Sequence, residues 1–290
     1  MQNEVKNNLS VSFDNSTMSD KEFSLFSSMI YSVTGIKLPP VKKLMLISRL
    51  NKRMKALEIK TYGEYYDYVC SPAGKSGEYH KMIDAVTTNK TEFFREPEHF
   101  SILRDRVLPE LSSTDRFRQG NPINIWSAGC STGEEPYTIA MVTSEYFMEE
   151  RASVSILATD ISTKVLSTAI NGVYPEKIID PIPLALKKKY VLRGKGENKG
   201  VFRMTPEIRR MINFSKLNLM DERFIFNREM DIVFCRNVII YFDRDTQIKL
   251  FDKFYDIITP GGYLFIGSSE TLHGLNDRFK PVGPTVYIKR

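Results

Sequence analysis

Short apolar segments alternate with helix-like segments along the last two thirds of this chain of 290 residues. The apolar segments end at Trp126, Asp160, Cys235 and Gly267, and helical patterns lie between them. Strands that alternate with helices form a parallel, doubly wound sheet. We therefore predict an α/β fold for residues 97–290.

This alternation breaks at about residues 174–217. Three short apolar segments lie there, and glycines separate the first two: Tyr190–Leu192, Val201–Met204 and Met211–Phe214. Short strands joined by turns that contain glycine are typical of antiparallel hairpins. We therefore predict a small antiparallel β insertion within the sheet domain.

Residues 18–86 have the pattern of a small all-helical domain. Ser19 with Glu22, and Thr61 with Glu64, have the spacing of a helix capping box. A helix predicted over about residues 40–57 has an apolar stripe of Leu44, Ile47, Leu50, Met54 and Leu57. We expect residues 1–17 to be a flexible tail and residues 87–96 to be a linker.

The positive charge of the chain is concentrated in one helix. The net charge is +6, and the segment from Lys37 to Lys60 contains eight Lys or Arg residues and one Glu, which accounts for the whole basic excess. Four basic side chains fall on the face opposite to the apolar stripe: Lys42, Arg49, Lys52 and Arg53. Such a face attracts nucleic acid, an anionic membrane or an acidic protein surface, although a merely solvated helix face has the same pattern.

The usage of cysteine and histidine argues against a disulfide framework and a structural metal site. The three cysteines and three histidines are scattered along the chain, without the spacing of zinc ligands. No apolar run approaches the roughly 18 residues that cross a bilayer, and the N-terminus has no signal-peptide pattern. We therefore expect a cytoplasmic protein that binds no metal and does not insert into a membrane.

A turn that contains glycine follows the first predicted strand, where an open α/β sheet binds its ligand. Gly129 and Gly133 allow the backbone to approach a ligand closely. The turn lacks the full Gly-x-Gly-x-x-Gly pattern and continues instead into Glu134 and Glu135. Carboxylates at a helix N-terminus repel phosphate and suit an amino or sulfonium cation, which favours S-adenosylmethionine over NAD. Alternatively, these two acids only stabilise the helix through its dipole and bind no ligand.

The second predicted strand ends in an acid, Asp160. An acid at this position is placed to accept hydrogen bonds from both hydroxyls of a ribose, in dinucleotide-binding and methyl-donor folds alike. The alternative is a cap for the helix that follows. Cys235 ends a later strand and has no imidazole partner nearby in the sequence, so we interpret it as a buried small residue.

Five motifs occur in one order along the chain: Thr87–Glu96 (TTNKTEFFRE), Trp126–Tyr137 (WSAGCSTGEEPY), Ala158–Asp160, Leu217–Leu219 and Phe234–Asp243 (FCRNVIIYFD). Together they resemble the CheR family of chemotaxis receptor methyltransferases, and the resemblance extends over about residues 19–289. It implies a Rossmann-like enzyme that binds S-adenosylmethionine and releases S-adenosylhomocysteine. It also implies that the substrates are glutamate side chains on cytoplasmic helices of chemoreceptors, which become γ-carboxyl methyl esters.

The resemblance implies a set of donor-binding residues: Asn89, Thr91 and Arg95 from the linker, Glu135 at the methionine end, Asp160 at the ribose, Asn218 and Leu219 at the adenine, and Arg236 and Asn237 at the floor. Arg95 and Tyr241 would flank the transferring methyl group. The helical domain, through its basic face, and the β insertion would both face the receptor. In some family members the insertion also binds a tethering peptide at the end of the receptor.

The implied chemistry needs no general base, because a glutamate carboxylate with a pKa of about 4.3 is already ionised at neutral pH. Arg95 is interpreted as an orienting group, since a guanidinium matches the two oxygens of a carboxylate. The hydroxyl of Tyr241 would position the same carboxylate. Two alternatives stay open. One is an RNA methyltransferase, although this chain lacks the Asn-Pro-Pro-Tyr motif that is common in enzymes that methylate the amino groups of bases. The other is a non-catalytic sensor of S-adenosylmethionine.

Overall fold

The computed structural model describes residues 17–147 and 154–290, and these residues form two compact units. One unit consists of the chain up to Ile30 together with Leu38–Val86. The other consists of Tyr31–Lys37 together with Thr87–Arg290. Except for Thr17, the tail expected at residues 1–17 lies outside the described residues.

Helices build the described part of the first unit: α1 (Asp20–Thr34, whose last four residues belong to the second unit), the 3₁₀ helix η1 (Pro40–Lys42), α2 (Lys43–Ala56), α3 (Tyr62–Cys70), α4 (Pro72–Lys75) and α5 (Glu78–Val86). Both predicted capping boxes are confirmed. The backbone N–H of Glu22 donates to Ser19 Oγ at 3.2 Å, and the Ser19 N–H donates to the Glu22 carboxylate at 2.7 Å. Thr61 and Glu64 exchange the equivalent pair at 3.2 and 3.1 Å.

The apolar stripe predicted for α2 was wrong at its first position. Leu44 is 78% exposed, whereas Leu46, Leu50 and Met54 are buried. At about 100° per residue, Leu44 lies about 120° from Leu50 around the helix, whereas Leu46 lies within about 40° of it. The buried face therefore follows the four-residue spacing that starts at Leu46, and the N-terminal end of α2 leaves an apolar side chain in solvent.

The described residues of the second unit form ten strands: β1 (Ile123–Ala128), β2 (Val154–Asp160), β3 (Val173–Pro175), β4 (Val191–Arg193), β5 (Val201–Met204), β6 (Ile212–Lys216), β7 (Met230–Cys235), β8 (Ile258–Ile266), β9 (Phe279–Gly283) and β10 (Val286–Lys289). Its described helices are α6 (Pro97–Ile102), the π-helical turn η2 (Leu103–Val107), α7 (Leu108–Ser112), α8 (Asp115–Arg118), α9 (Glu134–Tyr146), α10 (Thr163–Asn171), η3 (Glu176–Ile178), α11 (Leu184–Tyr190), η4 (Gly196–Asn198), α12 (Pro206–Arg210), η5 (Ile239–Tyr241) and α13 (Arg244–Ile257). Within the described residues, no helix of the protein is both long enough and apolar enough to cross a membrane.

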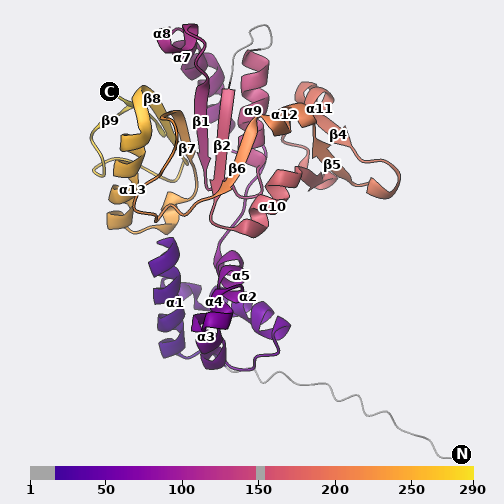
Figure 1. Ribbon diagram of the computed structural model, residues 1–290, viewed down its shortest axis with the longest axis vertical. Helices are drawn as coiled ribbons and strands as arrows, with labels where there is room; N and C mark the ends of the chain where they lie inside the picture. The colour runs from indigo at the N-terminus through magenta and orange to yellow at the C-terminus, as the bar shows by residue number, and fades with distance from the viewer. Residues whose placement is uncertain (1–16, 148–153) are drawn as a thin grey trace, which may run out of the picture. The chain divides into compact units, whose positions relative to one another are not determined.

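A seven-stranded sheet with the order β6-β2-β1-β7-β8-β10-β9 organises this unit. The first five strands in this order run parallel, and β10 pairs antiparallel with β8 and β9. Figure 1 shows α13 on one side of the sheet and α9 and α10 on the other. Ile125 packs with Ile139 of α9 in one apolar cluster, and Trp126 packs with Phe254 of α13 in another. The predicted doubly wound α/β fold is therefore confirmed.

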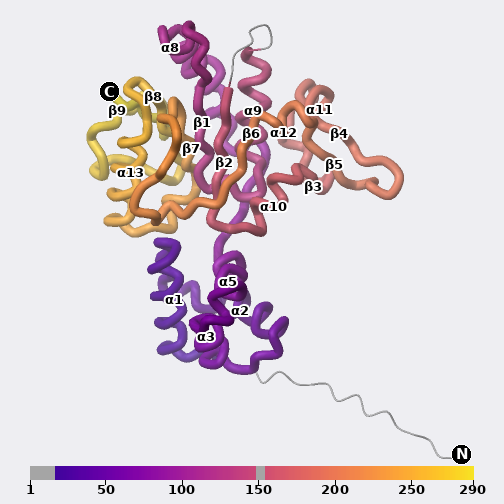
Figure 2. The backbone as a smooth tube through the Cα atoms, viewed as in Figure 1, coloured from indigo at the N-terminus to yellow at the C-terminus, as the bar shows by residue number. Residues whose placement is uncertain are grey.

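The antiparallel insertion exists, but one of its predicted strands was wrong. The insertion is a three-stranded sheet with the order β3-β5-β4, and Figure 2 shows its β4–β5 hairpin extending away from the main sheet. The segment predicted as its third strand, Met211–Phe214, instead contributes to β6, which pairs in parallel with β2. Ile212 and Phe214 alternate with polar neighbours and pack into the cluster around α9, which places this strand on the main sheet.

The strand order reverses between β1 and β7. The chain passes from β1 to β2 and then β6 on one side, and afterwards crosses to β7 on the other side of β1. Ligands of open α/β sheets bind outside the carboxyl ends of the strands at such a point. These ends are Ala128 in β1, Asp160 in β2 and Cys235 in β7.

Candidate active site

The turn between β1 and α9 is held against the end of β2. The backbone N–H groups of Gly129 and Cys130 both donate to the carbonyl of Thr159, at 2.8 and 2.9 Å. Gly129 has a φ of +75°, and a Cβ on it would lie 2.6 Å from Cγ2 of Val238. Because both the conformation and the space exclude a side chain, this turn exposes bare backbone at the position where the sequence predicted a close approach to a ligand.

Asp160 joins this turn to β2 through its carboxylate. Oδ2 accepts from the N–H of Ser131, and Oδ1 accepts from the N–H of Ser162, each at 2.9 Å. The N-cap of α10 is Ser162, whose Oγ accepts from the N–H of Val165. Asp160 therefore supports the start of α10 without being its cap. It lies beside the turn between β1 and α9 that contains Gly129, which we call the glycine turn.

Arg236 lies between two carboxylates, Glu96 and Glu135. Its Nη1 donates to Glu135 and its Nη2 donates to Glu96, both at 3.1 Å. We call these three residues the carboxylate–arginine triad. The Arg236 side chain is 2% exposed, whereas those of Glu96 and Glu135 are 17% and 14% exposed. A cationic ligand can therefore contact the acids, while the arginine is enclosed.

Glu96 was missed by the sequence analysis. It has a left-handed φ of +54°, and its carboxylate accepts from Ser268 Oγ at 2.9 Å and from Asn237 Nδ2 at 3.2 Å. It thereby connects the linker with the loops that follow β7 and β8. The available signal was its position between Arg95, a predicted site residue, and Pro97, which begins α6.

The pKa values of the two acids shift in opposite directions. Burial raises the pKa of Glu96, but the charge of Arg236 and the hydrogen bonds described above outweigh burial and lower it to about 2. Burial raises the pKa of Glu135, and the Arg236 charge and a hydrogen bond from Ser127 Oγ, at 2.7 Å, partly oppose it. Glu96 is therefore ionised throughout the neutral pH range.

The linker contacts the glycine turn directly. The carbonyl of Asn89 accepts from Ser131 Oγ at 3.1 Å. Arg95 Nη1 donates to the carbonyl of Lys90 at 3.0 Å, which closes the linker into a loop that contains the half-buried Thr91. The three linker residues predicted for the site are therefore on one loop, and that loop lies beside the turn after β1.

The loop after β7 contains Asn237 and Tyr241. Asn237 has a φ of +58°, and its N–H donates to Glu270 at 3.1 Å. The buried Glu270 carboxylate also accepts from two backbone N–H groups at the start of η5, at 2.8 and 3.2 Å. One carboxylate thus fixes the loop whose helix η5 ends at Tyr241.

The segment Tyr31–Lys37, which we call the strap, contacts two predicted parts of the site. Asn218 Nδ2 donates to the carbonyl of Val33 at 2.6 Å, and the N–H of Lys37 donates to the carbonyl of Tyr241 at 3.0 Å. Asn218 Oδ1 accepts from the N–H of Met220 at 3.0 Å. Both ends of the Asn218 carboxamide are therefore engaged within the protein, where they fix the loop that contains the buried Leu219.

Lys253 of α13 supports this loop from another side, and the sequence analysis did not identify it. Its Nζ donates to the carbonyls of Leu219 and Asp221, at 2.5 and 2.8 Å, and lies 4.7 Å from the ring centre of Phe224. Burial lowers the pKa of Lys253. The lysine therefore anchors backbone carbonyls next to the predicted adenine residues.

We expect the substitution Lys253→Met to weaken binding of S-adenosylhomocysteine about tenfold, because two carbonyls lose a charged donor. Isothermal titration calorimetry measures this affinity. Lys249→Met, at an exposed position of the same helix, serves as the matched control and should leave affinity unchanged. Equal affinities of both variants and the unsubstituted protein would show that Lys253 does not support the site.

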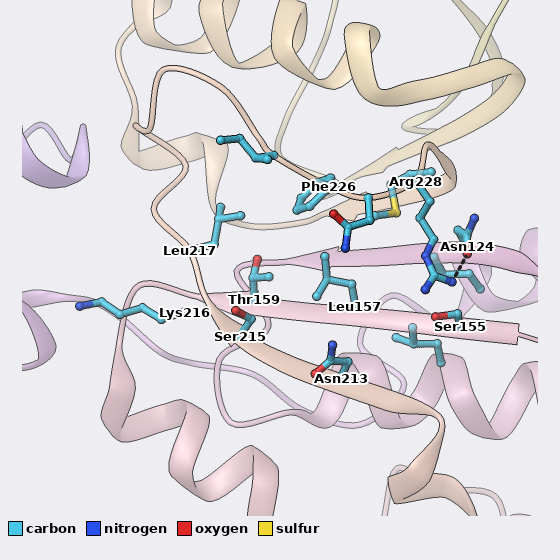
Figure 3. Close-up of a pocket in the computed structure, with 15 residues that line it drawn as sticks. Asn124, Ser155, Leu157, Thr159, Asn213, Ser215, Lys216, Leu217, Phe226 and Arg228 are labelled. Atoms are coloured by element: carbon cyan, nitrogen blue, oxygen red, sulfur yellow. Dashed lines mark hydrogen bonds between the residues drawn. The ribbon is translucent and has the colours of Figure 1, made fainter.

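A cavity of about 460 Å³ lies on the face of β1, β2 and β6 under the segment 217–230. Figure 3 shows Ser155, Asn213 and Ser215 along the strands and Phe226 on the covering segment. Arg228 closes one end by donating to Asn124 Oδ1 at 3.1 Å. The other end contains Thr159, which directly precedes Asp160, so the cavity adjoins the candidate site without containing its acids.

The four basic residues predicted to dock a partner divide into two pairs. Arg53 donates to Glu78 at 2.9 and 2.7 Å, and Arg49 donates to the carbonyl at the end of α5. Glu78 is 4% exposed, so the arginine compensates a buried charge. Lys42 and Lys52 are exposed. The arginines thus have structural partners within their own unit, and the two lysines carry the exposed charge.

Two family models match the chain in succession. "CheR methyltransferase, all-alpha domain" matches residues 21–87, and "CheR methyltransferase, SAM binding domain" matches residues 89–288. The two matches together span nearly all of the described chain.

Curated relatives agree with these matches. The chemotaxis protein methyltransferase of Borreliella burgdorferi is 40% identical over 95% of this chain and 96% of the relative. Chemotaxis protein methyltransferase 2 of Pseudomonas aeruginosa is 37% identical over 92% of each chain, and the Escherichia coli protein is 35% identical over 93% of this chain and 91% of the relative. The chain therefore belongs to the CheR family and is a chemotaxis methyltransferase that uses S-adenosylmethionine.

Proposed function

We propose that this enzyme methylates glutamate side chains on the cytoplasmic helices of chemoreceptors and so forms γ-carboxyl methyl esters. The observation that carries the proposal is the convergence of three features at one edge of the sheet. They are the glycine turn, Asp160 at the end of β2, and the carboxylate–arginine triad. The names of the relatives place them in chemotaxis, which supports receptors as the substrates.

The residues at this edge fit a cationic sulfur nucleoside. The turn at Gly129 presents backbone without a side chain to a ligand, and the two partly exposed acids of the triad suit a cation. We assign the ribose hydroxyls to Asp160 and the methionine ammonium to Glu135. The remaining donor contacts are assigned to Asn89, Thr91, Arg95, Asn218, Leu219, Arg236 and Asn237. When bound, S-adenosylmethionine supplies an electrophilic methyl group on a sulfonium.

The titratable groups near the site favour an acceptor that is already ionised. Burial and the nearby Arg236 charge lower the pKa of His99 to about 4, and its Nε2 is hydrogen bonded to Thr285 at 2.8 Å. Burial raises the pKa of the Cys130 and Cys235 thiols. These three side chains are therefore poorly suited to take a proton from an acceptor or to attack the methyl group, and a carboxylate acceptor requires neither step.

Arg95 and Tyr241 are assigned to the acceptor carboxylate. A guanidinium and a phenol hydroxyl can hold the two oxygens so that one of them lies in line with the methyl group, at about 3 Å. The positive sulfur and the negative oxygen both lose charge during transfer. A site that excludes water therefore favours the transfer more than bulk solvent does.

Methyl transfer onto receptor membranes tests the proposed function. The protein is incubated with tritiated S-adenosylmethionine and membranes that contain candidate receptors, and the labelled product is then treated with alkali. We expect labelled methanol, because alkali hydrolyses carboxyl methyl esters and leaves N-methyl groups intact. Alkali-stable label, label on RNA, or binding without transfer would contradict the proposal.

Exposed residues of the first unit provide a proposed docking surface for the receptor. Lys42 and Lys52 are exposed, and Val41 and Leu44 are 82% and 78% exposed. We expect Lys42→Glu combined with Lys52→Glu to reduce the rate of receptor methylation about tenfold, because an acidic receptor helix would then meet like charge. The affinity for S-adenosylhomocysteine should not change.

The matched control for this docking test is Lys249→Glu combined with Lys280→Glu, two exposed lysines of the second unit. These substitutions change the net charge equally and should leave methylation intact. A similar loss in both variants would indicate a general charge effect and contradict the docking surface. A receptor-tethering peptide, if this protein uses one, is assigned to the β insertion, where β4 is an edge strand that can pair with an added strand.

A further inference from the structure

We propose that Tyr174, a residue of the β insertion, is a positioning residue for the donor site, because it fixes the glycine turn and the linker relative to each other. The family resemblance implied a receptor-facing role for this insertion. The inference rests on the proposed binding of the donor at the glycine turn, and it adds a residue that acts on donor binding through that turn.

The Tyr174 hydroxyl holds the glycine turn through the main chain of Thr132. Its Oη donates to the Thr132 carbonyl at 2.7 Å. Pro136, four residues further along the chain, cannot donate to this carbonyl, because proline has no N–H. Burial raises the pKa of Tyr174, so the hydroxyl keeps its proton and remains a donor. The insertion therefore supplies a hydrogen bond that the start of α9 cannot supply.

Gly133, at the end of the glycine turn, packs against the same hydroxyl. Its φ is +100°, and a Cβ on it would lie 2.9 Å from Tyr174 Oη, so both conformation and space exclude a side chain. The preceding part of the turn is held by Ser131, whose N–H donates to Asp160 and whose Oγ donates to the carbonyl of Asn89. The turn is thus held by the end of β2, by the linker and by Tyr174.

The ring of Tyr174 holds the linker through Phe93. The ring centre of the buried Phe93 lies 5.2 Å from that of Tyr174, edge to face, and 5.9 Å from that of Phe202. Tyr174 and Phe202 are paired residues of β3 and β5. Phe93 lies between Thr91 and Arg95, two linker residues that are assigned to the donor. One side chain of the insertion therefore contacts both segments that are assigned to the donor.

Removing only the hydroxyl should release the glycine turn and keep the aromatic core. Tyr174→Phe retains the ring against Phe93 but leaves the Thr132 carbonyl without its donor, which favours other conformations of the turn. The apparent affinity of a ligand falls with the fraction of protein in the binding-competent conformation. We expect the Kd for S-adenosylhomocysteine to rise about tenfold, which corresponds to a competent fraction of about one tenth.

The kinetic constants should separate in the same variant. The KM for S-adenosylmethionine should rise about as much as the Kd, because both depend on the competent fraction. The kcat at saturating donor should stay within about twofold of that of the unsubstituted protein, because a saturating nucleoside draws the turn back to its binding conformation.

Tyr137→Phe is the matched control. Tyr137 is also buried, and its hydroxyl donates at the same 2.7 Å to the carbonyl of Ala169, which lies on α10 and not on the glycine turn. Thermal unfolding should show a similar loss of stability in both variants, whereas calorimetric titration should show loss of affinity in Tyr174→Phe alone. Equal affinities of the two variants, whether unchanged or reduced, would indicate a merely structural role and overturn the inference.

A second pair of variants tests the linker contact and replaces the first pair if Tyr174→Phe does not fold. Phe93→Leu removes the ring that packs on Tyr174 and should weaken binding of S-adenosylhomocysteine about fivefold. Phe147→Leu, at a buried position of the same apolar cluster, should leave this affinity unchanged. Equal affinities in this pair would likewise overturn the inference. If the unsubstituted protein itself does not bind the nucleoside, the proposed donor site fails, and the inference with it.

Discussion

The substitution Asp160→Asn is expected to weaken binding of S-adenosylhomocysteine about a hundredfold. Asp160 accepts from the N–H groups of Ser131 and Ser162, and its carboxylate is also assigned to the two ribose hydroxyls. An amide replaces one acceptor by a donor, so a ribose hydroxyl loses a charge-assisted bond and the glycine turn loses part of its anchor. Calorimetric titration measures the change.

Asp277→Asn, an exposed acid of the same unit, is the matched control for this prediction and should bind the nucleoside normally. Thermal unfolding of Asp160→Asn distinguishes loss of binding from loss of fold. A folded Asp160→Asn protein with unchanged affinity would show that this acid does not hold the ribose.

The substitution Arg95→Ala should reduce kcat for receptor methylation by about a hundredfold and change the affinity for S-adenosylhomocysteine less than threefold. The guanidinium is assigned both to the donor, whose binding several other residues share, and to the acceptor carboxylate, which it orients during transfer, so transfer should suffer more than binding of the nucleoside. The carbonyl of residue 95, which accepts from Arg236, is retained in the variant. Single-turnover transfer and calorimetry together give both quantities.

Arg104→Ala provides the control, because Arg104 is a 57% exposed arginine of the same unit that pairs with Asp105. Its kcat should equal that of the unsubstituted protein. If Arg95→Ala loses nucleoside affinity in proportion to kcat, Arg95 binds the donor and does not orient the acceptor.

The architecture could be predicted from the sequence because the signals for its helices, strands and turns are local or periodic. The capping boxes at Ser19 and Thr61 depend on residues three apart, and the glycine turn follows directly from β1. The strand Ile212–Lys216 was assigned to the wrong sheet because its alternating pattern suits either sheet. The sheet that it joins is decided by the long-range pairing with β2, which no local pattern encodes.

The candidate site was less predictable because its support comes from distant parts of the chain. Glu96 and Arg236 are separated by 140 residues, and Lys253 reaches a loop more than thirty residues earlier. The family resemblance identified Arg236 and Glu135 as site residues, but it did not identify Glu96, the second acid that binds Arg236. The sequence analysis placed Arg53 on a solvent-facing basic surface, because the buried Glu78 that pairs with it lies on another helix. Ion pairs of this kind depend on tertiary packing and produce no periodic pattern in the sequence.

The strap has a consequence for any attempt to divide this enzyme. A proteolytic fragment that starts at Thr87 would keep every strand of the main sheet but would lack Val33 and Lys37, whose main-chain groups bind Asn218 and Tyr241. The cut that looks natural in the linear order of the chain would thus release two site loops from part of their scaffold. The catalytic half of this protein is therefore discontinuous, and seven residues that precede most of the helical unit belong to it.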